Sequence, residues 1–198
     1  MRYNFIYNTV LNVYKCMDKI SFPLNIKELI ENPKCKIRSY SNFADENNIS
    51  FNQVCELCNS ETGCTHFDVR KCNFLILYNE QMVDGRIRWT LAHEYGHIAL
   101  NHFFLLQDCS MSEHIPTDTL DNTLEREADF FAATLLSPFP LFELLNIKSS
   151  IDVQNTFGLS DEASLNRFSQ YIHWKRSHIK TAWENDLKRL YQLKQDNN

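Results

Sequence analysis

One amphipathic segment constrains the fold of this chain more than any other. Between residues 86 and 102, apolar side chains recur at spacings of three and four, and they occupy Leu91, Ala92, Tyr95, Gly96, Ile98 and Ala99, together with Trp89. This period predicts a largely buried helix. We expect it to begin near Arg86, after an Asp84-Gly85 turn with Asp84 as its cap, and to continue through His102.

The polar residues inside this segment have the spacing of a metal site. His93 and His97 are four residues apart, about 40° round a helix axis and one turn along it, so both imidazoles can reach one ion. Glu94 would lie beside the ion without binding it, where it can take a proton from an attacking water. We therefore predict one catalytic Zn²⁺, with His93 and His97 as ligands and Glu94 as the base.

A catalytic zinc needs a third protein ligand, and a second periodic segment supplies one. Its apolar face predicts a helix that ends at Ser137-Pro138. Glu125 and Asp129 share another face of that helix, and we predict that Glu125 binds the metal while Asp129 accepts the free ring N–H of a zinc-bound histidine. Glu127 projects about 200° from Glu125 and remains the alternative ligand, since the two cannot both face the ion.

A third histidine, His102, stands at the end of the first predicted helix. One known pattern takes a third histidine ligand six residues beyond the second, after a glycine, but Leu100 and Phe103 occupy those two positions. That pattern fails here. We interpret His102 as a residue of the helix C-terminus, where a partial positive charge is favoured.

The two segments together resemble the ImmA/IrrE family of metallopeptidases. The resemblance is carried by the strand before the first helix and by two blocks, Arg88-Trp89-Thr90-Leu91-Ala92-His93-Glu94-Tyr95-Gly96-His97-Ile98-Ala99-Leu100-Asn101-His102 and Glu125-Arg126-Glu127-Ala128-Asp129-Phe130-Phe131-Ala132-Ala133-Thr134-Leu135-Leu136-Ser137-Pro138. It implies a zincin-like fold and a cytoplasmic zinc endopeptidase, often encoded by phages or mobile elements. It also implies that the substrate is a helix-turn-helix transcriptional repressor, which cleavage inactivates.

The remaining segments indicate an α+β fold that is mainly helical with a small sheet. We expect strands at 36–40 and 73–79, a short helix capped by Ser50, a surface connection at 107–118, and helices at 4–20, 26–30, 139–146, 152–157, 161–173 and 178–194. We assign residues 1–146 to the zincin-like metallopeptidase domain and 147–198 to a helical C-terminal region.

Part of that region resembles a helix-turn-helix. Residues 152–168 read as helix, turn, helix, with Gly158 in the turn and Ser160 as the second cap. Asp161 and Glu162 stand at the start of the second helix, where a DNA reader needs basic or amide side chains. We therefore expect packing or substrate docking, and no direct binding of nucleic acid.

Composition and charge bear on the binding partners of the protein, its cellular location and the state of its cysteines. A formal charge of −5 disfavours a nonspecific nucleic-acid binder. Neither an N-terminal signal sequence nor an apolar run of about 20 residues is evident, so we expect a cytoplasmic protein with no membrane contact. Seven cysteines, an odd number, then indicate reduced thiols or metal ligands. Cys55, Cys58, Cys64 and Cys72 leave open a structural metal, against free thiols in a variable insertion.

The residues leave two alternatives to a zinc endopeptidase acting on a protein substrate. One is a non-catalytic regulator that contains zinc, and the other is a DNA-binding transcription factor that uses residues 152–168. The intact Glu94 disfavours the first, and the acidic charge disfavours the second.

Overall fold

The computed structural model describes residues 1–105, 117–177 and 181–196. The chain divides into two compact units. Unit 1 comprises Met1 and residues 26–132, and unit 2 comprises residues 2–25 and 133–198. The predicted domain division at 146/147 stays a prediction.

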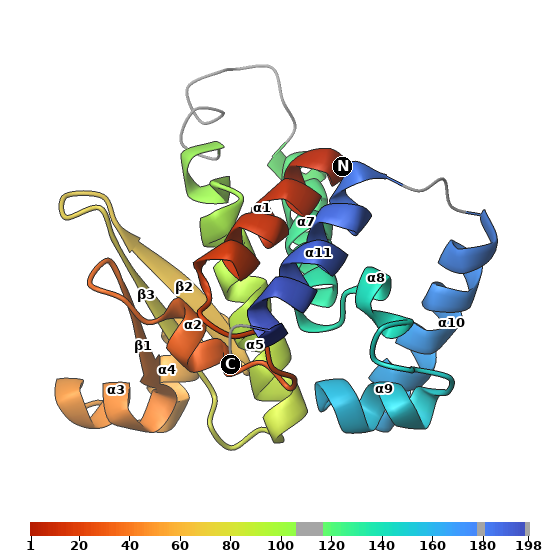
Figure 1. Cartoon of the computed structure of the whole chain (residues 1–198). Helices are drawn as coiled ribbons and strands as arrows, with labels where there is room; N and C mark the ends of the chain where they lie inside the picture. The colour runs from red at the N-terminus through yellow and green to blue at the C-terminus, as the bar shows by residue number, and fades with distance from the viewer. Residues whose placement is uncertain (106–116, 178–180, 197–198) are drawn as a thin grey trace. The chain divides into compact units, whose positions relative to one another are not determined.

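Unit 1 is built round a three-stranded sheet of order β1-β3-β2 (Figure 1). Its strands are β1 (Cys35–Ser39), β2 (Gly63–Asp68) and β3 (Asn73–Tyr78). The central strand, β3, pairs parallel with β1 and antiparallel with β2. The β2–β3 turn is held by Asp68, whose Oδ1 accepts hydrogen bonds from the backbone N–H groups of Arg70 and Lys71. The edge strand β2 is therefore tied to the sheet by a tight hairpin.

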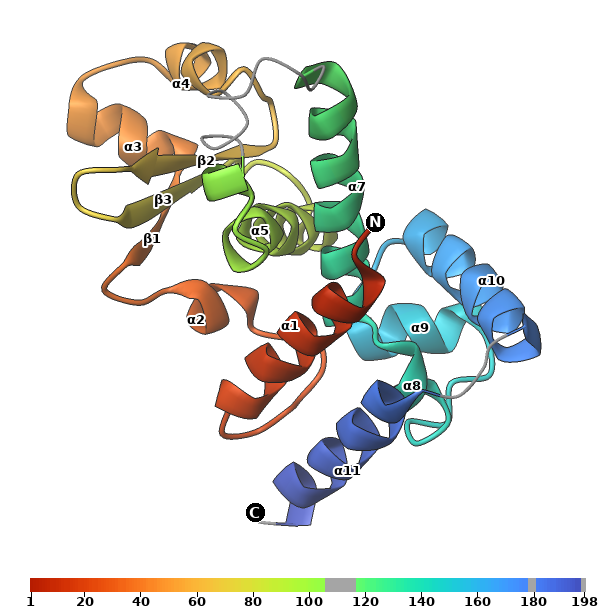
Figure 2. The ribbon, with the colours of Figure 1, turned by 90° about the horizontal axis from the view of Figure 1, so that it is seen from above.

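Helices cover both faces of this sheet (Figure 2). They are α2 (Ile26–Ile30), α3 (Tyr40–Asn47), α4 (Phe51–Cys58) and α5 (Asp84–Ala99). The part of α7 (Thr117–Leu136) that belongs to unit 1 packs on α5. Leu75 and Leu77 of β3 pack with Tyr40 of α3 and Val54 of α4. Because side chains alternate along a strand, Gly63 and Thr65 of β2 lie on the opposite face, toward α5.

Two close approaches fix α5 in unit 1. A Cβ placed on Gly63 would lie 2.5 Å from Thr90 Cγ2, so only glycine lets β2 come this near to α5. A Cβ on Gly96 would lie 3.1 Å from a ring carbon of Phe131 and 3.3 Å from both the Cα and the carbonyl oxygen of Ala128. The helices α5 and α7 therefore pack with their backbones unusually close at Gly96.

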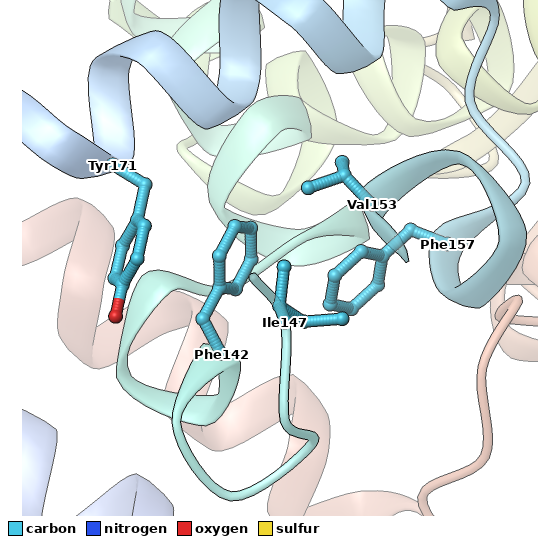
Figure 3. Packing of buried hydrophobic residues seen from close by; sticks show 5 residues of the cluster. All are labelled: Phe142, Ile147, Val153, Phe157 and Tyr171. Atoms are coloured by element: carbon cyan, nitrogen blue, oxygen red, sulfur yellow. The ribbon is translucent and has the colours of Figure 1, made fainter. Parts of the chain in front are cut away.

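Unit 2 is helical in the described residues. It contains α1 (Tyr3–Cys16), the last residues of α7, α8 (Phe139–Phe142), α9 (Ser150–Phe157), α10 (Asp161–Ser177) and α11 (Ala182–Asp196). Figure 3 shows its apolar cluster, which is formed by Phe142, Ile147, Val153, Phe157 and Tyr171. The buried guanidinium of Arg167 donates to the carbonyl and hydroxyl oxygens of Ser137 and lies over the Phe139 ring. That contact joins α10 to the segment that follows α7.

The α+β fold class predicted from the sequence is confirmed. The predicted strands and the Ser50 cap are present, and Gln53 completes a capping box with Ser50. Gly158 adopts the left-handed conformation between α9 and α10, and Ser160 Oγ accepts the backbone N–H of Ala163. The sequence analysis missed α3 and β2. The expected surface connection at 107–118 lies outside the described residues up to 116, and 117–118 belong to α7.

The helix that bears His93 has different ends from those expected. It begins at Asp84 with Val83 as N-cap, and the Asp84 side chain lies in the first turn without capping the helix. It ends at Ala99, because Asn101 adopts a left-handed φ of 60° that terminates the helical ladder. His102 therefore follows the helix and is not part of it.

No helix among the described residues has the length and apolar composition that a membrane crossing requires.

We predict that Gly96→Val lowers the free energy of unfolding by about 1–3 kcal/mol, the usual cost of forcing extra carbons into a packed site. Valine would press on the α7 backbone at Ala128, which has no flexible end to move aside. The measurement is urea denaturation of the metal-free protein. Arg126→Val, on the exposed face of α7, is the control and should change stability by less than about 0.5 kcal/mol. Equal stability of the two variants would contradict the close packing.

Candidate metal centre

Three electron-pair donors from α5 and α7 converge on one point in unit 1. His93 Nε2 lies 3.2 Å from His97 Nε2 and 3.2 Å from Glu125 Oε2, and His97 Nε2 lies 3.4 Å from Glu125 Oε1. Within the described ranges, this is the only group of at least three His, Cys, Asp or Glu side chains whose ligand atoms all lie within 4.8 Å. The sequence analysis named the same three residues as ligands.

The spacing of these donors fits a zinc ion. Zinc–ligand bonds of about 2.0–2.1 Å in a tetrahedron place neighbouring ligand atoms roughly 3.3 Å apart. The 3.2 Å between the two Nε2 atoms agrees with that value, and each Nε2 has one carboxylate oxygen of Glu125 at a similar distance, Oε2 at 3.2 Å from His93 and Oε1 at 3.4 Å from His97. Two imidazoles and one carboxylate are also the donor set of a catalytic site, which leaves a fourth position for water or substrate. These side chains therefore lie close enough to bind one ion, usually zinc in metallopeptidases.

Asp129 lies one turn beyond Glu125 and contacts the other side of His93. Its Oδ1 is 2.9 Å from His93 Nδ1. If this nitrogen carries the ring proton, it donates to the carboxylate and leaves Nε2 free for a metal. The geometry is the one that the sequence analysis expected for Asp129.

The alternative ligand, Glu127, is directed elsewhere. Only 1% of the residue is exposed, and its Oε2 lies 3.4 Å from His102 Nε2. It is absent from the group of convergent ligand atoms. The helical wheel indicates only that the two side chains cannot both face the ion, because two residues along α7 rotate the side chain to a different face. In the structure Glu125 is the one that lies beside the two histidines.

The interpretation of His102 as a residue of the helix C-terminus is wrong, because α5 ends at Ala99. The residue is fully buried, and its Nδ1 lies 3.1 Å from His97 Nδ1. The left-handed turn at Asn101 carries the chain back beside α5 and places this imidazole behind His97. The sequence analysis missed the contact between His102 and His97 because it extended the helical spacing to residue 102, whereas the helix ends at Ala99.

Glu94 is held by the edge strand of the sheet. Thr65 Oγ1 of β2 donates a hydrogen bond of 2.7 Å to Glu94 Oε2. Burial raises the pKa of Glu94, and the Thr65 hydrogen bond opposes this rise. A raised pKa suits a carboxylate that must both accept and return a proton.

The two histidines differ electrostatically. Burial lowers the pKa of His93, but the hydrogen bond to Asp129 and the nearby carboxylates outweigh it, and its pKa is raised. Burial, and after it electrostatic interaction with the His93 and His102 rings, lowers the pKa of His97 to about 3. His97 is therefore a neutral imidazole, the form that binds metals.

These groups line a cleft of about 740 Å³, within the roughly 300–1,000 Å³ of typical ligand pockets. One wall is the end of α4 and strand β2, including Gly63, Cys64 and Thr65. The rest consists of side chains from α5 and α7, which are Arg86, Trp89, Thr90, His93, Glu94, His97, Glu125 and Asp129. The three convergent side chains and Glu94 thus line the same cleft.

The cysteines between residues 55 and 72 follow the sequence prediction only in part. Cys58 and Cys64 form a disulfide, with Cα atoms 5.6 Å apart, whereas Cys55 and Cys72 are free. Either free thiols or ligands of a structural metal were expected, and for Cys58 and Cys64 both expectations are wrong. The segment is also part of the sheet and the cleft wall, not a peripheral insertion. Its alternation of Thr65 and Phe67 with polar residues is the signal that predicts a strand.

Comparison with known proteins gives one family. Residues 57–169 match the model of Peptidase_M78, described as an IrrE N-terminal-like domain. This range contains β2, the helices α5 and α7, and part of α10. No curated protein sequence matches the chain significantly.

A solved structure, a Mycobacterium tuberculosis transcriptional regulator, is similar at 13% identity with a TM-score of 0.49. The match covers 85% of this chain and 48% of that protein, so the chain spans about half the length of its relative. We transfer neither activity nor partner from it.

We predict that the purified chain binds one zinc ion and that Glu125→Ala reduces its zinc affinity by at least about tenfold, because one of three ligands is lost. Zinc content by elemental analysis and competition with a chromophoric chelator provide the measurement. Glu56→Ala removes an exposed carboxylate of α4 and should leave affinity unchanged. Unaltered binding in Glu125→Ala would exclude it from the ligand set.

Proposed function

The chain belongs to the Peptidase_M78 family with an IrrE N-terminal-like domain, and from this premise we propose that it is a zinc-dependent endopeptidase that hydrolyses a peptide bond in a protein substrate. The observation that carries the proposal is the convergence of His93, His97 and Glu125 in a cleft that also contains Glu94. A structural zinc would be closed by a fourth protein ligand. Three donors beside a positioned carboxylate favour hydrolysis instead.

In such a reaction each residue of the site has a distinct role. When bound, zinc polarises the scissile carbonyl and increases the acidity of the attacking water. Glu94 accepts the proton of that water and passes it to the leaving amine. Thr65 orients the Glu94 carboxylate through its hydrogen bond, and Asp129 orients the His93 ring.

We propose a helix-turn-helix transcriptional repressor as the substrate. The resemblance of the two helical blocks to the ImmA/IrrE family supports this assignment. Cleavage would then release transcription of the genes that the repressor controls, in a phage, a mobile element or a stress regulon. The proposal places the reaction in the cytoplasm, where such repressors act.

Direct binding of DNA is not part of this proposal. Although α9 and α10 are joined by a tight turn at Gly158, Asp161 and Glu162 are exposed in the first turn of α10. Two carboxylates there would face phosphates with the wrong charge. We assign α9 and α10 to packing within unit 2, where Val153, Phe157 and Tyr171 share one apolar cluster.

We predict that Glu94→Gln abolishes cleavage, with kcat reduced by at least about 10²-fold, because the amide cannot accept the proton. The experiment co-expresses the chain with helix-turn-helix repressors encoded beside it and maps new termini by mass spectrometry. Zinc content should stay at the wild-type level, since Glu94 is not a ligand. A chelator should stop the wild-type reaction, and added zinc should restore it.

The same experiment separates the proposal from a non-catalytic regulator. A regulator that only binds zinc would leave every repressor intact and would act equally well as Glu94→Gln. Unchanged transcriptional output in that variant would refute the peptidase.

We also predict that Thr65→Val lowers kcat by about tenfold, with KM and zinc content little changed. Valine has nearly the same shape but cannot donate to Glu94, and a hydrogen bond to a charged group contributes about 1.5–3 kcal/mol. Steady-state kinetics on the identified substrate provide the measurement. His66→Val, at the neighbouring exposed position of β2, is the matched control. Equal kcat values for the two variants would show that Thr65 does not orient the base.

A further inference from the structure

Behind His97 lie two buried polar side chains, His102 and Glu127, that the proposed reaction does not use. His97 Nδ1 is 3.1 Å from His102 Nδ1, and His102 Nε2 is 3.4 Å from Glu127 Oε2. His102 is fully buried, and Glu127 is 1% exposed. Burying a carboxylate and an imidazole carries a considerable cost unless polar or charged groups compensate it, and the contact between His102 and Glu127 is one such interaction.

Only one placement of the ring protons along the contacts from His97 through His102 to Glu127 leaves His97 Nε2 free to bind a metal. If His97 binds the ion through Nε2, its ring proton must be on Nδ1, which then donates to His102 Nδ1. His102 must accept there, so its own proton is on Nε2, the nitrogen that faces the Glu127 carboxylate. The proton on His97 Nδ1 then has His102 Nδ1 as its acceptor, and the N–H at His102 Nε2 faces the Glu127 carboxylate in an electrostatic contact of 3.4 Å.

The opposite arrangement would prevent binding. If His102 carried its proton on Nδ1, it would donate to His97, and the His97 proton would have to move to Nε2. That nitrogen points toward His93 and Glu125, so the proton would occupy the ion's place. The Glu127 carboxylate opposes this state because it favours a proton on His102 Nε2.

We propose that His102 and Glu127 are positioning residues that fix the tautomer and ring orientation of His97 and so prepare the site for its metal. The proposal rests on the proposed function for the identity of that site. It gives the two ligand histidines parallel support from α7: Asp129 contacts His93 directly, whereas Glu127 acts on His97 through one intervening imidazole. Outer partners of metal-bound histidines typically contribute 10–100-fold in affinity.

The test compares His102→Phe with His102→Asn in the full chain. Phenylalanine fills the volume of the imidazole but offers no acceptor to His97 Nδ1. Asparagine is smaller, yet its Oδ1 takes nearly the position of the histidine Nδ1 and can accept the same hydrogen bond. A positioning role and a packing role therefore predict opposite orders of zinc affinity.

We expect His102→Phe to bind Zn²⁺ about 10–100-fold more weakly than wild type, and His102→Asn to retain most of the affinity although its metal-free form is less stable. Glu127→Gln should fall between them. Competition with a chromophoric chelator measures affinity, and urea denaturation measures the stability of each metal-free variant. His66→Phe makes the same substitution at an exposed histidine and should change neither. Affinity in His102→Phe equal to or above that in His102→Asn would overturn the proposal.

A second measurement uses the wild-type protein and does not depend on the folding of variants. Ring ¹⁵N NMR of the metal-free chain should find His97 protonated on Nδ1 and His102 on Nε2. A proton on His102 Nδ1 would overturn the proposal. Zinc binding without cleavage of any protein would refute the proposed function alone, while cleavage with unaltered zinc affinity in His102→Phe would refute this inference alone.

Discussion

The close packing of α5 on α7 at Gly96 is the constraint on which the site depends. With no side chain at Gly96, the backbone of α5 lies against Ala128. Ala128 stands between Glu127 and Asp129, so this contact fixes which face of α7 each carboxylate presents. Glu125 and Asp129 then lie opposite His93, while Glu127 is directed to His102. One helix–helix contact thus sets the position of every carboxylate that α7 contributes.

The sheet contributes to the site at one point, where strand β2 holds the carboxylate of Glu94. Gly63 lets β2 run alongside α5, and two residues later Thr65 reaches Glu94. A two-residue step along a strand nearly equals a four-residue step along a helix, so Gly63 and Thr65 match Thr90 and Glu94 in register. The proposed metal ligands come from two helices, whereas the residue that holds Glu94, the proposed base, comes from a strand. The two sets of groups can therefore be placed independently.

Much of the site was predictable from the sequence because it lies on helices with strong periodicity. His93 and His97 are separated by one helical turn, as are Glu125 and Asp129, and local geometry alone decides that each pair shares a face. The same geometry set Glu127 apart from Glu125. What was not predictable lies outside those helices. Strand β2 was missed since its cysteines suggested a metal knuckle, and α3 was missed since its apolar residues are few.

The sequence by itself determined the elements and the chemistry: two amphipathic helices, their ligand spacing, a buried central strand, and a family of peptidases whose model matches residues 57–169. These follow from interactions between residues that are near in the chain. Tertiary structure decided what lies behind the ligands. Whether His102 is solvated or buried depends on the left-handed turn at Asn101, and whether Thr65 reaches Glu94 depends on pairing across the sheet and on two glycine contacts. Such contacts join residues far apart in sequence, where no periodicity connects them, so packing alone brings them together.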